Sequence, residues 1–166
     1  MEELMPLAEA IAARLIARKE TIGIAESSTG GLISAALLAV PGASAYYRGG
    51  GIIYTPRARA ALVDITKEEM EGMRASSEPY AALLAGRARD LLGATWGLSE
   101  TGATGPTGNR YGDAAGHSCI GVAGPVSQTI TLETGLSQRR QNMVAFAHRA
   151  LETMKECLEK ASEKTA

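Results

Sequence analysis

The sequence predicts an α/β protein, a three-layer α/β/α sandwich around a mixed, mostly parallel sheet. Helical periodicity alternates with short apolar segments typical of buried strands along nearly the whole chain. One pair of adjacent strands, "HSCIGVAG" and "QTITLET", is separated by the turn signal "GPVS" and predicts a hairpin that contributes one antiparallel strand. The length of 166 residues fits a single domain over residues 1–166.

The first half of the chain predicts helix, strand, helix, strand and a short helix. Apolar residues recur at three- and four-residue steps over residues 2–18, which indicates a helix with one buried stripe. "TIGIA" predicts a short buried strand, and the helix that begins at Leu32 ends at Pro41-Gly42. "GGGIIYT" predicts the second strand, and "PRARAALVDI" begins the next helix with a proline, which a first helical turn tolerates.

The second half continues the alternation. Thr66 and Glu69 match a capping box, and Ser77-Glu78-Pro79 predicts the start of a helix that ends near Leu92. "ATWGLSET" and "HSCIGVAG" predict strands on either side of the glycine-rich "GATGPTGNRYGDAAG". Helical periodicity returns over residues 138–160 and closes the predicted fold.

Composition and charge exclude several classes of protein. With 17 basic and 18 acidic residues the formal charge is -1. The sequence has no block of basic residues of the kind that indicates a nucleic-acid partner. No apolar run approaches the roughly 18 residues of a membrane span, and the amino terminus lacks the pattern of a secretory signal, so we expect a soluble cytoplasmic protein. Two cysteines and two histidines have no zinc-site spacing, so we expect no metal.

The loop "AESSTGG" is the first candidate for a ligand site, because ligands of open α/β sheets lie where strands pass into helices. Ser27, Ser28 and Thr29 supply hydroxyls, while Gly30 and Gly31 let backbone N–H groups approach a phosphate or an oxyanion. The alternative is that Ser28 or Thr29 only caps the helix. The loop matches neither the G-x-S-x-G elbow nor a Walker loop, because Ala25 replaces the first glycine of the elbow and no G-K-[ST] follows.

Two further loops carry candidates. In "GATGPTG", Gly102, Gly105 and Gly108 recur every third residue, a spacing that disfavours a dinucleotide fingerprint but permits close backbone approach to a ligand. A tight connector is the alternative. "GGGIIYTPRAR" places Tyr54 at the end of a predicted strand and Arg59 in the next helical turn, and the alternatives there are a packing tyrosine and a solvated arginine.

Together these segments resemble the CinA carboxy-terminal domain family, whose enzymatic members are nicotinamide-nucleotide amidohydrolases. "AESSTGGLISAALLAVPGASAYYRGGGIIYT" resembles the family's A-E-S-C-T-G-G, P-G-(A/S)-S and G-G-x-x-x-Y-(S/T) motifs. "SSEP" resembles V-S-E-P, and "TGATGPTG" resembles (S/T)-G-x-A-G-P-x-G-G. The order and the spacing of the motifs also match over nearly the whole chain.

The resemblance implies a function and a set of site residues. It implies an often dimeric enzyme that hydrolyses nicotinamide mononucleotide to nicotinate mononucleotide and ammonia, without a metal or a redox cofactor. It implies that Ser27 is the nucleophile, that Tyr54 and the position of Arg59 form its activating group, and that Thr101 lies beside the reacting centre. The residues it implies as substrate contacts are Ser28, Thr29, Gly30, Gly31, Gly50, Ser77, Gly102, Gly105, Arg139 and Arg140.

The main departure from the family pattern is Arg59, because the amidohydrolases usually carry lysine there. A guanidinium stays protonated and has no acceptor, so it cannot serve as a base. Our hypothesis is that the charge of Arg59 stabilises a tyrosinate at Tyr54, which then accepts the proton from Ser27. His117 is another possible acceptor, although a histidine entering a strand more often makes ordinary hydrogen bonds.

Other departures concern the same loops. Ser28 stands where the family has cysteine, Thr104 and Asn109 replace an alanine and a glycine, and "TGLSQRRQ" replaces a G-D-R-x-x-(V/I)-R pattern. Arg139 and Arg140 meet a phosphate if that loop is displaced; otherwise they form a solvated helix start.

Two alternatives and one expectation about assembly remain open. The first alternative is a nucleotide-binding relative without turnover, which the change to Arg59 favours. The second is a pterin-phosphate binder, since "TGATG" faintly resembles the T-G-G-T-G of molybdopterin-binding domains. Tyr46, Tyr47 and Trp96, taken as exposed apolar residues, are compatible with a homodimer.

Overall fold

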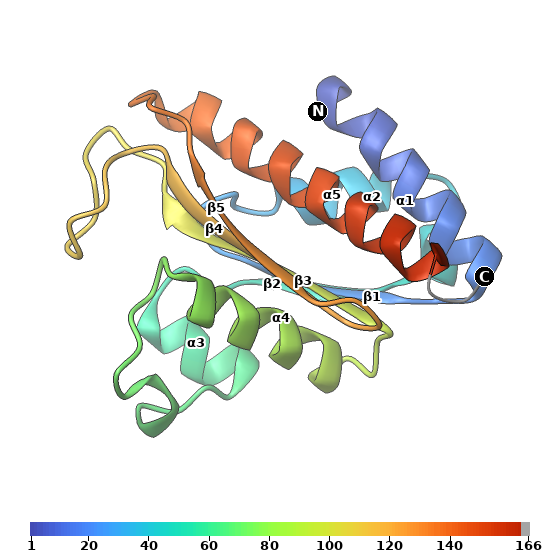
Figure 1. Cartoon of the computed structure of the whole chain (residues 1–166), viewed down its shortest axis with the longest axis horizontal. Helices are drawn as coiled ribbons and strands as arrows, with labels where there is room; N and C mark the ends of the chain where they lie inside the picture. The colour runs from blue at the N-terminus through green and yellow to red at the C-terminus, as the bar shows by residue number, and fades with distance from the viewer. Residues whose placement is uncertain (164–166) are drawn as a thin grey trace.

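A five-stranded mixed sheet forms the centre of the computed structural model, which describes residues 1–163 (Figure 1). The strand order is β2-β1-β3-β4-β5; the pairs that β1 forms with β2 and β3 are parallel, and the pairs that β4 forms with β3 and β5 are antiparallel. The predicted hairpin is therefore confirmed, and β4 is the one strand of opposite direction. The bounds are β1 (Ile22–Glu26), β2 (Tyr47–Ile52), β3 (Trp96–Ala103), β4 (His117–Ala123) and β5 (Gln128–Glu133).

Helices cover both faces of the sheet and make the three predicted layers. One face carries α1 (Met5–Arg18), α2 (Leu32–Ala39) and α5 (Arg139–Glu163), and the opposite face carries α3 (Pro56–Val63) and α4 (Glu78–Leu91) (Figure 1). Short 3-10 turns form η1 (Glu2–Leu4), η2 (Ala43–Ala45) and η3 (Glu68–Met70). The α/β/α sandwich with a mixed, mostly parallel sheet is confirmed.

Local capping sets where several helices begin. The Thr55 side chain accepts from Ala58 N at 3.1 Å, and Pro56 follows it in the first turn of α3. Thr66 and Glu69 exchange two hydrogen bonds, from Thr66 N at 2.9 Å and from Glu69 N at 3.2 Å, so the predicted capping box is confirmed. The second strand ends at Ile52, earlier than the sequence predicted, so Tyr54 and Thr55 lie in the loop between β2 and α3.

Each face of the sheet has its own apolar core. Trp96, Leu98, Ile120 and Val122 project from the sheet into the layer of α1, α2 and α5. The other core is formed by Ala25, Ile53, Val63, Ile65, Tyr80, Leu84 and Ala88. β1 is buried along its whole length, so the loop that follows its carboxyl end begins in the interior of the molecule.

Two strand glycines let α4 lie directly on the sheet. A Cβ on Gly97 would lie 1.8 Å from the Ala85 carbonyl oxygen, and one on Gly121 would lie 2.4 Å from the Ala81 carbonyl oxygen. The Ser99 hydroxyl donates to that Ala81 carbonyl at 2.6 Å. This close contact fixes the amino end of α4 against β3, which forms one side of the site described below.

The structure corrects the expectation that Tyr46 and Trp96 are exposed. Both side chains are fully buried. Trp96 Nε1 donates to Glu20 at 2.7 Å, and the Tyr46 hydroxyl donates to the Leu37 carbonyl, so each polar group has a partner inside the fold. Their exposure therefore cannot support a homodimer; Tyr47 is partly buried.

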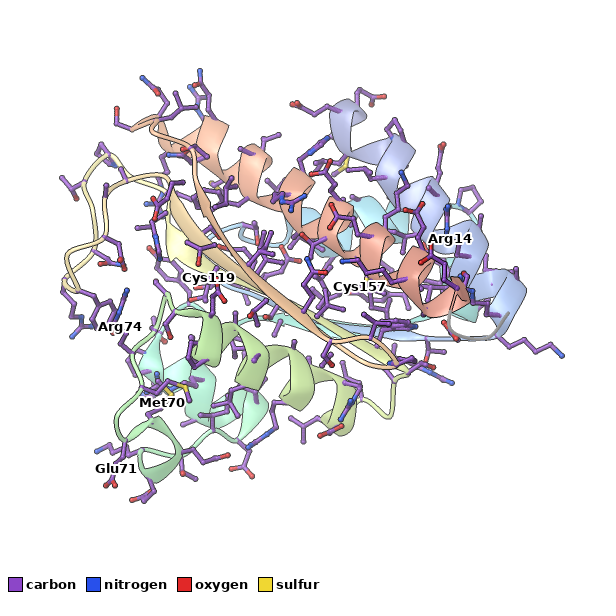
Figure 2. The ribbon with its side chains drawn as sticks, in the orientation of Figure 1. Arg14, Met70, Glu71, Arg74, Cys119 and Cys157 are labelled. Atoms are coloured by element: carbon purple, nitrogen blue, oxygen red, sulfur yellow. The ribbon has the colours of Figure 1, made fainter. Side chains whose placement is uncertain are left out.

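Cys119 on β4 and Cys157 on α5 are both buried and unpaired with each other (Figure 2). Among the helices of residues 1–163, none has the length and apolar character needed to cross a bilayer.

Candidate active site

Four of the residues predicted for the reacting centre line one cavity. Ser27 follows β1, Tyr54 and Arg59 follow β2, and Thr101 lies near the end of β3. The cavity has a volume of about 290 Å³, and its other walls include Ser76, Tyr80, Asn109, Arg110 and Tyr111. The sheet therefore brings together side chains that are up to 74 positions apart, Ser27 to Thr101, at the carboxyl ends of parallel strands.

A second cavity, also about 290 Å³, adjoins the first and shares Tyr54, Gly102 and Asn109 with it. Ser28, Gly105 and Arg139 line its remaining walls together with Ala103, Thr104, Thr107 and Gly108. The two cavities give the site one end at Ser27 and a more polar end where Arg139 supplies a positive charge.

Ser27 presents a hydroxyl with no competing partner. Its side chain is partly buried, and within residues 1–163 its Oγ makes no hydrogen bond. Its backbone N–H donates to Glu100 Oε2 at 3.2 Å, so the main chain is held while the hydroxyl remains available. No side chain able to accept a proton is hydrogen-bonded to Ser27 Oγ in the described residues.

The two arginines at the site have different partners from those the sequence suggested. Arg59 Cζ lies 5.8 Å from the centroid of the Tyr80 ring, and its buried Nε has no hydrogen-bond partner in the described part of the chain. Burial raises the pKa of Tyr80, and the nearby charge of Arg59 offsets only part of that rise. The aromatic ring that Arg59 contacts in this structure is therefore that of Tyr80.

Tyr54 is instead held by Arg139. Arg139 Nη2 donates to the Tyr54 hydroxyl at 3.2 Å, and Arg139 Nη1 donates to the Gly105 carbonyl at 2.9 Å. The guanidinium that is hydrogen-bonded to Tyr54 thus comes from the first turn of α5, and the activation of Tyr54 by Arg59 stays a prediction. Tyr54 is exposed and lines both cavities.

Thr101 stabilises one wall of the cavity through a hydrogen bond to Ser76. Its buried Oγ1 accepts from Ser76 N at 3.2 Å, and Ser76 adopts a left-handed backbone conformation with φ 56°. The Ser76 carbonyl points to β4, where His117 Nε2 lies 2.9 Å away. Thr101 and His117 therefore fix the segment before α4 from two sides.

His117 is not placed as a proton acceptor for Ser27. It lines neither cavity, and its two ring nitrogens contact Glu133 and the Ser76 carbonyl. Although burial opposes the charged ring, the bonds to Glu133 and Ser76 and the nearby Asp113 carboxylate raise the pKa of His117 above its usual value.

The loop between β3 and β4 is tied down by Asp113. Its carboxylate binds both terminal nitrogens of Arg74, at 2.5 and 3.0 Å, and accepts from Asn109 Nδ2 at 2.8 Å. Tyr111 lies against the guanidinium groups of Arg74 and Arg110, whose Cζ atoms are 5.4 and 5.8 Å from the ring centroid. These contacts hold Asn109, Arg110 and Tyr111 as the outer wall of the first cavity.

The threonine and glycine donors of the "AESSTGG" loop are used inside the protein. Glu26 accepts from Gly31 N at 3.0 Å, and Glu100 accepts from Thr29 N at 2.9 Å. The Thr29 hydroxyl lies between these two carboxyls, and Gly30 N donates to the Ser27 carbonyl at 3.2 Å. We expected these groups to bind an oxyanion or a phosphate; in this structure they are already occupied.

Sequence reasoning missed Glu26 and Glu100. Both are fully buried in strands that are otherwise apolar or small, and burial raises the pKa of Glu100. A carboxyl inside a buried strand needs several donors, and a loop of serines and threonine beside it supplies them. The segment "IAESST" contains this combination of a carboxyl and neighbouring hydroxyls. Nothing in the sequence indicated that the strand carrying Glu100 lies beside it.

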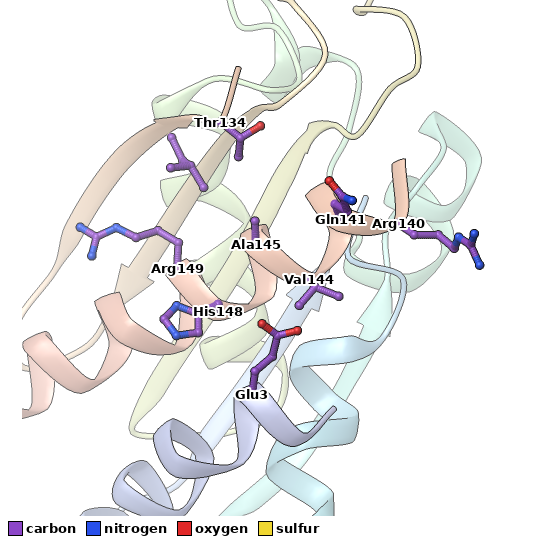
Figure 3. Close-up of a pocket in the computed structure, with 9 residues that line it drawn as sticks. Glu3, Thr134, Arg140, Gln141, Val144, Ala145, His148 and Arg149 are labelled. Atoms are coloured by element: carbon purple, nitrogen blue, oxygen red, sulfur yellow. The ribbon is translucent and has the colours of Figure 1, made fainter. Parts of the chain in front are cut away.

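Six predicted substrate contacts line neither cavity: Thr29, Gly30, Gly31, Gly50, Ser77 and Arg140. Gly50 pairs with Ile24 in the sheet and faces a separate apolar cavity beside Leu62 and Leu92. Ser77 caps α4, where its hydroxyl accepts from Tyr80 N and donates to the Arg74 carbonyl. Arg140 lines a different cavity of about 850 Å³, beside α5 and β5, with Glu3 and Val144 (Figure 3).

No metal centre is evident at these positions. Within residues 1–163, no three His, Cys, Asp or Glu side chains are grouped so that they could hold a metal ion. The polar side chains that line the two cavities carry hydroxyls, guanidinium groups and the Asn109 amide.

Comparison with known sequences and structures identifies similar proteins. The model of the CinA C-terminal domain matches residues 4–158. A CinA-like protein of Desulfosudis oleivorans is 37% identical over 142 residues, which is 85% of this chain and 34% of that protein. The chain spans about a third of the length of the curated relatives it matches.

Solved structures support the same assignment. A competence-damaged protein (CinA) superfamily protein from Escherichia coli superposes with a TM-score of 0.85 at 26% identity, covering 91% of this chain and 88% of that chain. The competence damage-inducible protein A from Klebsiella pneumoniae superposes with a TM-score of 0.88 at 25% identity, covering 94% and 97%.

Proposed function

This chain belongs to the CinA C-terminal domain family, and we propose that it is an amidohydrolase that converts nicotinamide mononucleotide to nicotinate mononucleotide and ammonia. The observation that carries the proposal is the free Ser27 hydroxyl on a cavity that also contains Tyr54, Arg59 and Thr101. Amide hydrolysis needs a nucleophile, a proton carrier and groups that stabilise an oxyanion, and these side chains offer such groups.

The proposed reaction begins with attack of Ser27 Oγ on the carboxamide carbon. The C–N bond breaks, the proton from Ser27 passes to the leaving nitrogen, and ammonia departs from an acyl-serine ester. Water then attacks the ester, which releases the carboxylate product and returns a proton to Ser27. We assign the proton transfer to the Tyr54 hydroxyl, because a phenol can both accept and donate and because Tyr54 lines the same cavity.

The arginines supply positive charge rather than base chemistry. Arg59 faces the cavity that contains Ser27, and Arg139 faces the adjoining cavity. A guanidinium binds phosphate or carboxylate oxygens by paired, charge-assisted hydrogen bonds. We therefore propose that Arg139 binds the phosphate of the nucleotide and that Arg59 stabilises negative charge near the reacting carbon.

A second candidate is a nucleotide-binding relative without turnover. Two observations favour it: Arg59 stands where the enzymatic members usually carry lysine, and no acceptor is hydrogen-bonded to Ser27 Oγ in the described residues. In that case the two cavities would bind the nucleotide but Ser27 would remain unreactive.

The deciding experiment measures ammonia release from purified protein incubated with nicotinamide mononucleotide, with thermal unfolding recorded on the same samples. Turnover that is lost in Ser27→Ala supports the amidohydrolase. Ser137→Ala is a matched control, because Ser137 is an exposed serine outside both cavities. A ligand-induced rise in Tm without ammonia supports the binding relative, and no response in either measurement rejects nicotinamide mononucleotide as the ligand.

Assembly and location remain proposals that the family resemblance supports. We propose a homodimer in the cytoplasm, and we propose that the whole described chain acts as one domain. Sedimentation of the purified chain tests the dimer.

A further inference from the structure

Two buried carboxyls meet at one hydroxyl behind Ser27. Thr29 Oγ1 lies 2.8 Å from Glu26 Oε2 and 3.0 Å from Glu100 Oε2, and all three side chains are fully buried. A threonine hydroxyl carries one hydrogen, so it can donate to only one of these carboxyls. One of these two carboxyl oxygens therefore receives no hydrogen from Thr29.

Within residues 1–163, no positive side chain contacts the two carboxyls. Their partners in the described residues are main-chain N–H groups and the hydroxyls of Ser28, Thr29, Ser34 and Ser118. On the α5 side the side chain packed against the loop is the neutral Met143, whose methyl lies 3.2 Å from the Cβ that Gly30 would carry. Two buried negative charges at this separation without a cation are strongly unfavourable.

The pattern of donors shows which carboxyl carries the proton. Both oxygens of Glu26 accept main-chain N–H groups: Oε1 from Ser34 at 2.8 Å, and Oε2 from Gly31 and Ile33 at 3.0 and 3.1 Å. Hydroxyls also contact these oxygens, Ser34 Oγ at 2.6 Å from Oε1 and Thr29 Oγ1 at 2.8 Å from Oε2, but a proton on either oxygen would compete with a main-chain N–H group, which cannot accept. Glu26 is therefore the member of the pair better suited to the negative charge.

Glu100 has one oxygen that suits a proton. Its Oε2 accepts from the main-chain N–H groups of Ser27 and Thr29 at 3.2 and 2.9 Å, but in the described part of the chain its Oε1 is hydrogen-bonded only to the hydroxyls of Ser28 and Ser118. A hydroxyl can accept as well as donate, so a proton on Oε1 finds an acceptor. Burial also raises the pKa of Glu100, which agrees with this assignment.

We propose that Glu26 and Glu100 share a single negative charge, with Glu100 as a neutral acid, and that Glu100 is the positioning residue for Ser27. The positioning role rests on the proposed amidohydrolase function, whereas the shared charge does not. Glu100 Oε2 holds the amides of Ser27 and Thr29, and so fixes the main chain on which the nucleophile sits. A neutral Glu100 also avoids placing a full negative charge behind the carbon where an oxyanion forms.

A matched pair of variants tests the charge assignment. In Glu100→Gln the amide oxygen can accept from Ser27 and Thr29 while the NH2 group donates to Ser28 and Ser118, as the neutral acid does. In Glu26→Gln the NH2 group must face a main-chain N–H group. We expect Glu100→Gln to unfold within about 3 °C of the wild type and Glu26→Gln to lose about 5 to 10 °C in Tm. Equal losses in both variants overturn the assignment.

Infrared spectroscopy gives a second readout that does not depend on stability. The wild-type protein at neutral pH should show the carbonyl stretching band of a protonated carboxylic acid, and Glu100→Gln should lose it. A wild-type spectrum without the band, or a band that survives in Glu100→Gln, overturns the neutral Glu100 even if Glu26→Gln does not fold.

Kinetics test the positioning role. We expect Glu100→Asp, whose shorter side chain withdraws the acceptor from Ser27 N, to lower kcat by roughly 100-fold with little change in KM. Glu100→Gln should have a kcat within about tenfold of the wild-type value, because its amide oxygen still accepts from Ser27 N. Full kcat in Glu100→Asp overturns the positioning role. No ammonia from the wild type refutes the proposed function instead, and the infrared band and the Tm values still decide the shared charge.

Discussion

Arg139 Nη2 donates to the Tyr54 hydroxyl at 3.2 Å, across 85 positions of sequence. The same guanidinium donates to the Gly105 carbonyl, so one side chain of α5 joins the loops that follow β2 and β3. Tyr54 lines both cavities, and Arg139 lines the one that is more distant from Ser27. This contact links the proposed phosphate end of the site to the proposed proton carrier.

Tyr54→Phe is expected to lower kcat by roughly 100-fold or more, because it removes the hydroxyl to which we assign proton transfer. The Tyr54 side chain is 58% exposed, so the folded protein should keep nearly its wild-type Tm. Ammonia release and thermal unfolding of the same preparation check both statements. Full activity in Tyr54→Phe would show that another group carries the proton.

Arg139→Ala is expected to raise KM for nicotinamide mononucleotide by about 10- to 100-fold, because a charge-assisted hydrogen bond contributes about 1.5 to 3 kcal/mol. Arg140→Ala is the matched control, since Arg140 is the next residue of α5 but lines the separate cavity in Figure 3. Initial rates over a range of substrate concentrations give both constants. An equal rise in KM for the two variants would contradict the assignment of the phosphate to Arg139.

Gly97→Ala is expected to destabilise the protein by about 3 kcal/mol or more, because the new Cβ would lie 1.8 Å from the Ala85 carbonyl and would push α4 off the sheet. Gly86→Ala is the control within α4, where nothing lies within 4 Å of the added Cβ. That variant should gain up to about 1 kcal/mol from helix propensity. Urea unfolding of the three proteins measures the differences, and a neutral Gly97→Ala would refute the close contact.

The pKa of His117 is raised in the folded protein, so folding favours the protonated ring. The stabilising contribution is fully present below the unfolded pKa of about 6.5 and is lost as the pH rises through the higher folded value. Wild-type stability should therefore fall over that range more than the stability of Glu133→Gln, which lacks the carboxylate that contacts His117 Nδ1. Denaturant unfolding at a series of pH values checks this, and parallel pH profiles would contradict it.

The local features of the sequence predicted most of the secondary structure. Helical periodicity, the Thr66–Glu69 capping box and the turn between β4 and β5 depend on neighbours a few residues apart, and each is confirmed. Burial was predicted less well, because Tyr46 and Trp96 lie in apolar surroundings that only the packing of α1, α2 and α5 on the sheet creates.

For the site, the motifs predicted that four residues lie close together, but they did not predict the contacts of these residues: Ser27, Tyr54, Arg59 and Thr101. They line one cavity because the carboxyl ends of parallel strands converge. Arg59 meets Tyr80, however, and Arg139 meets Tyr54, and these pairings depend on the directions of side chains from separate elements.

The sequence by itself determined the α/β class, the order of the elements and the loop that carries Ser27, because periodicity, caps and glycine patterns are local in the chain. The tertiary structure alone decided that Glu100 of β3 lies against the loop after β1 and completes its hydrogen bonds. The physical reason is that buried carboxyls are satisfied by whatever donors the fold brings to them, and those donors come from strands that are distant in the sequence but adjacent in the sheet.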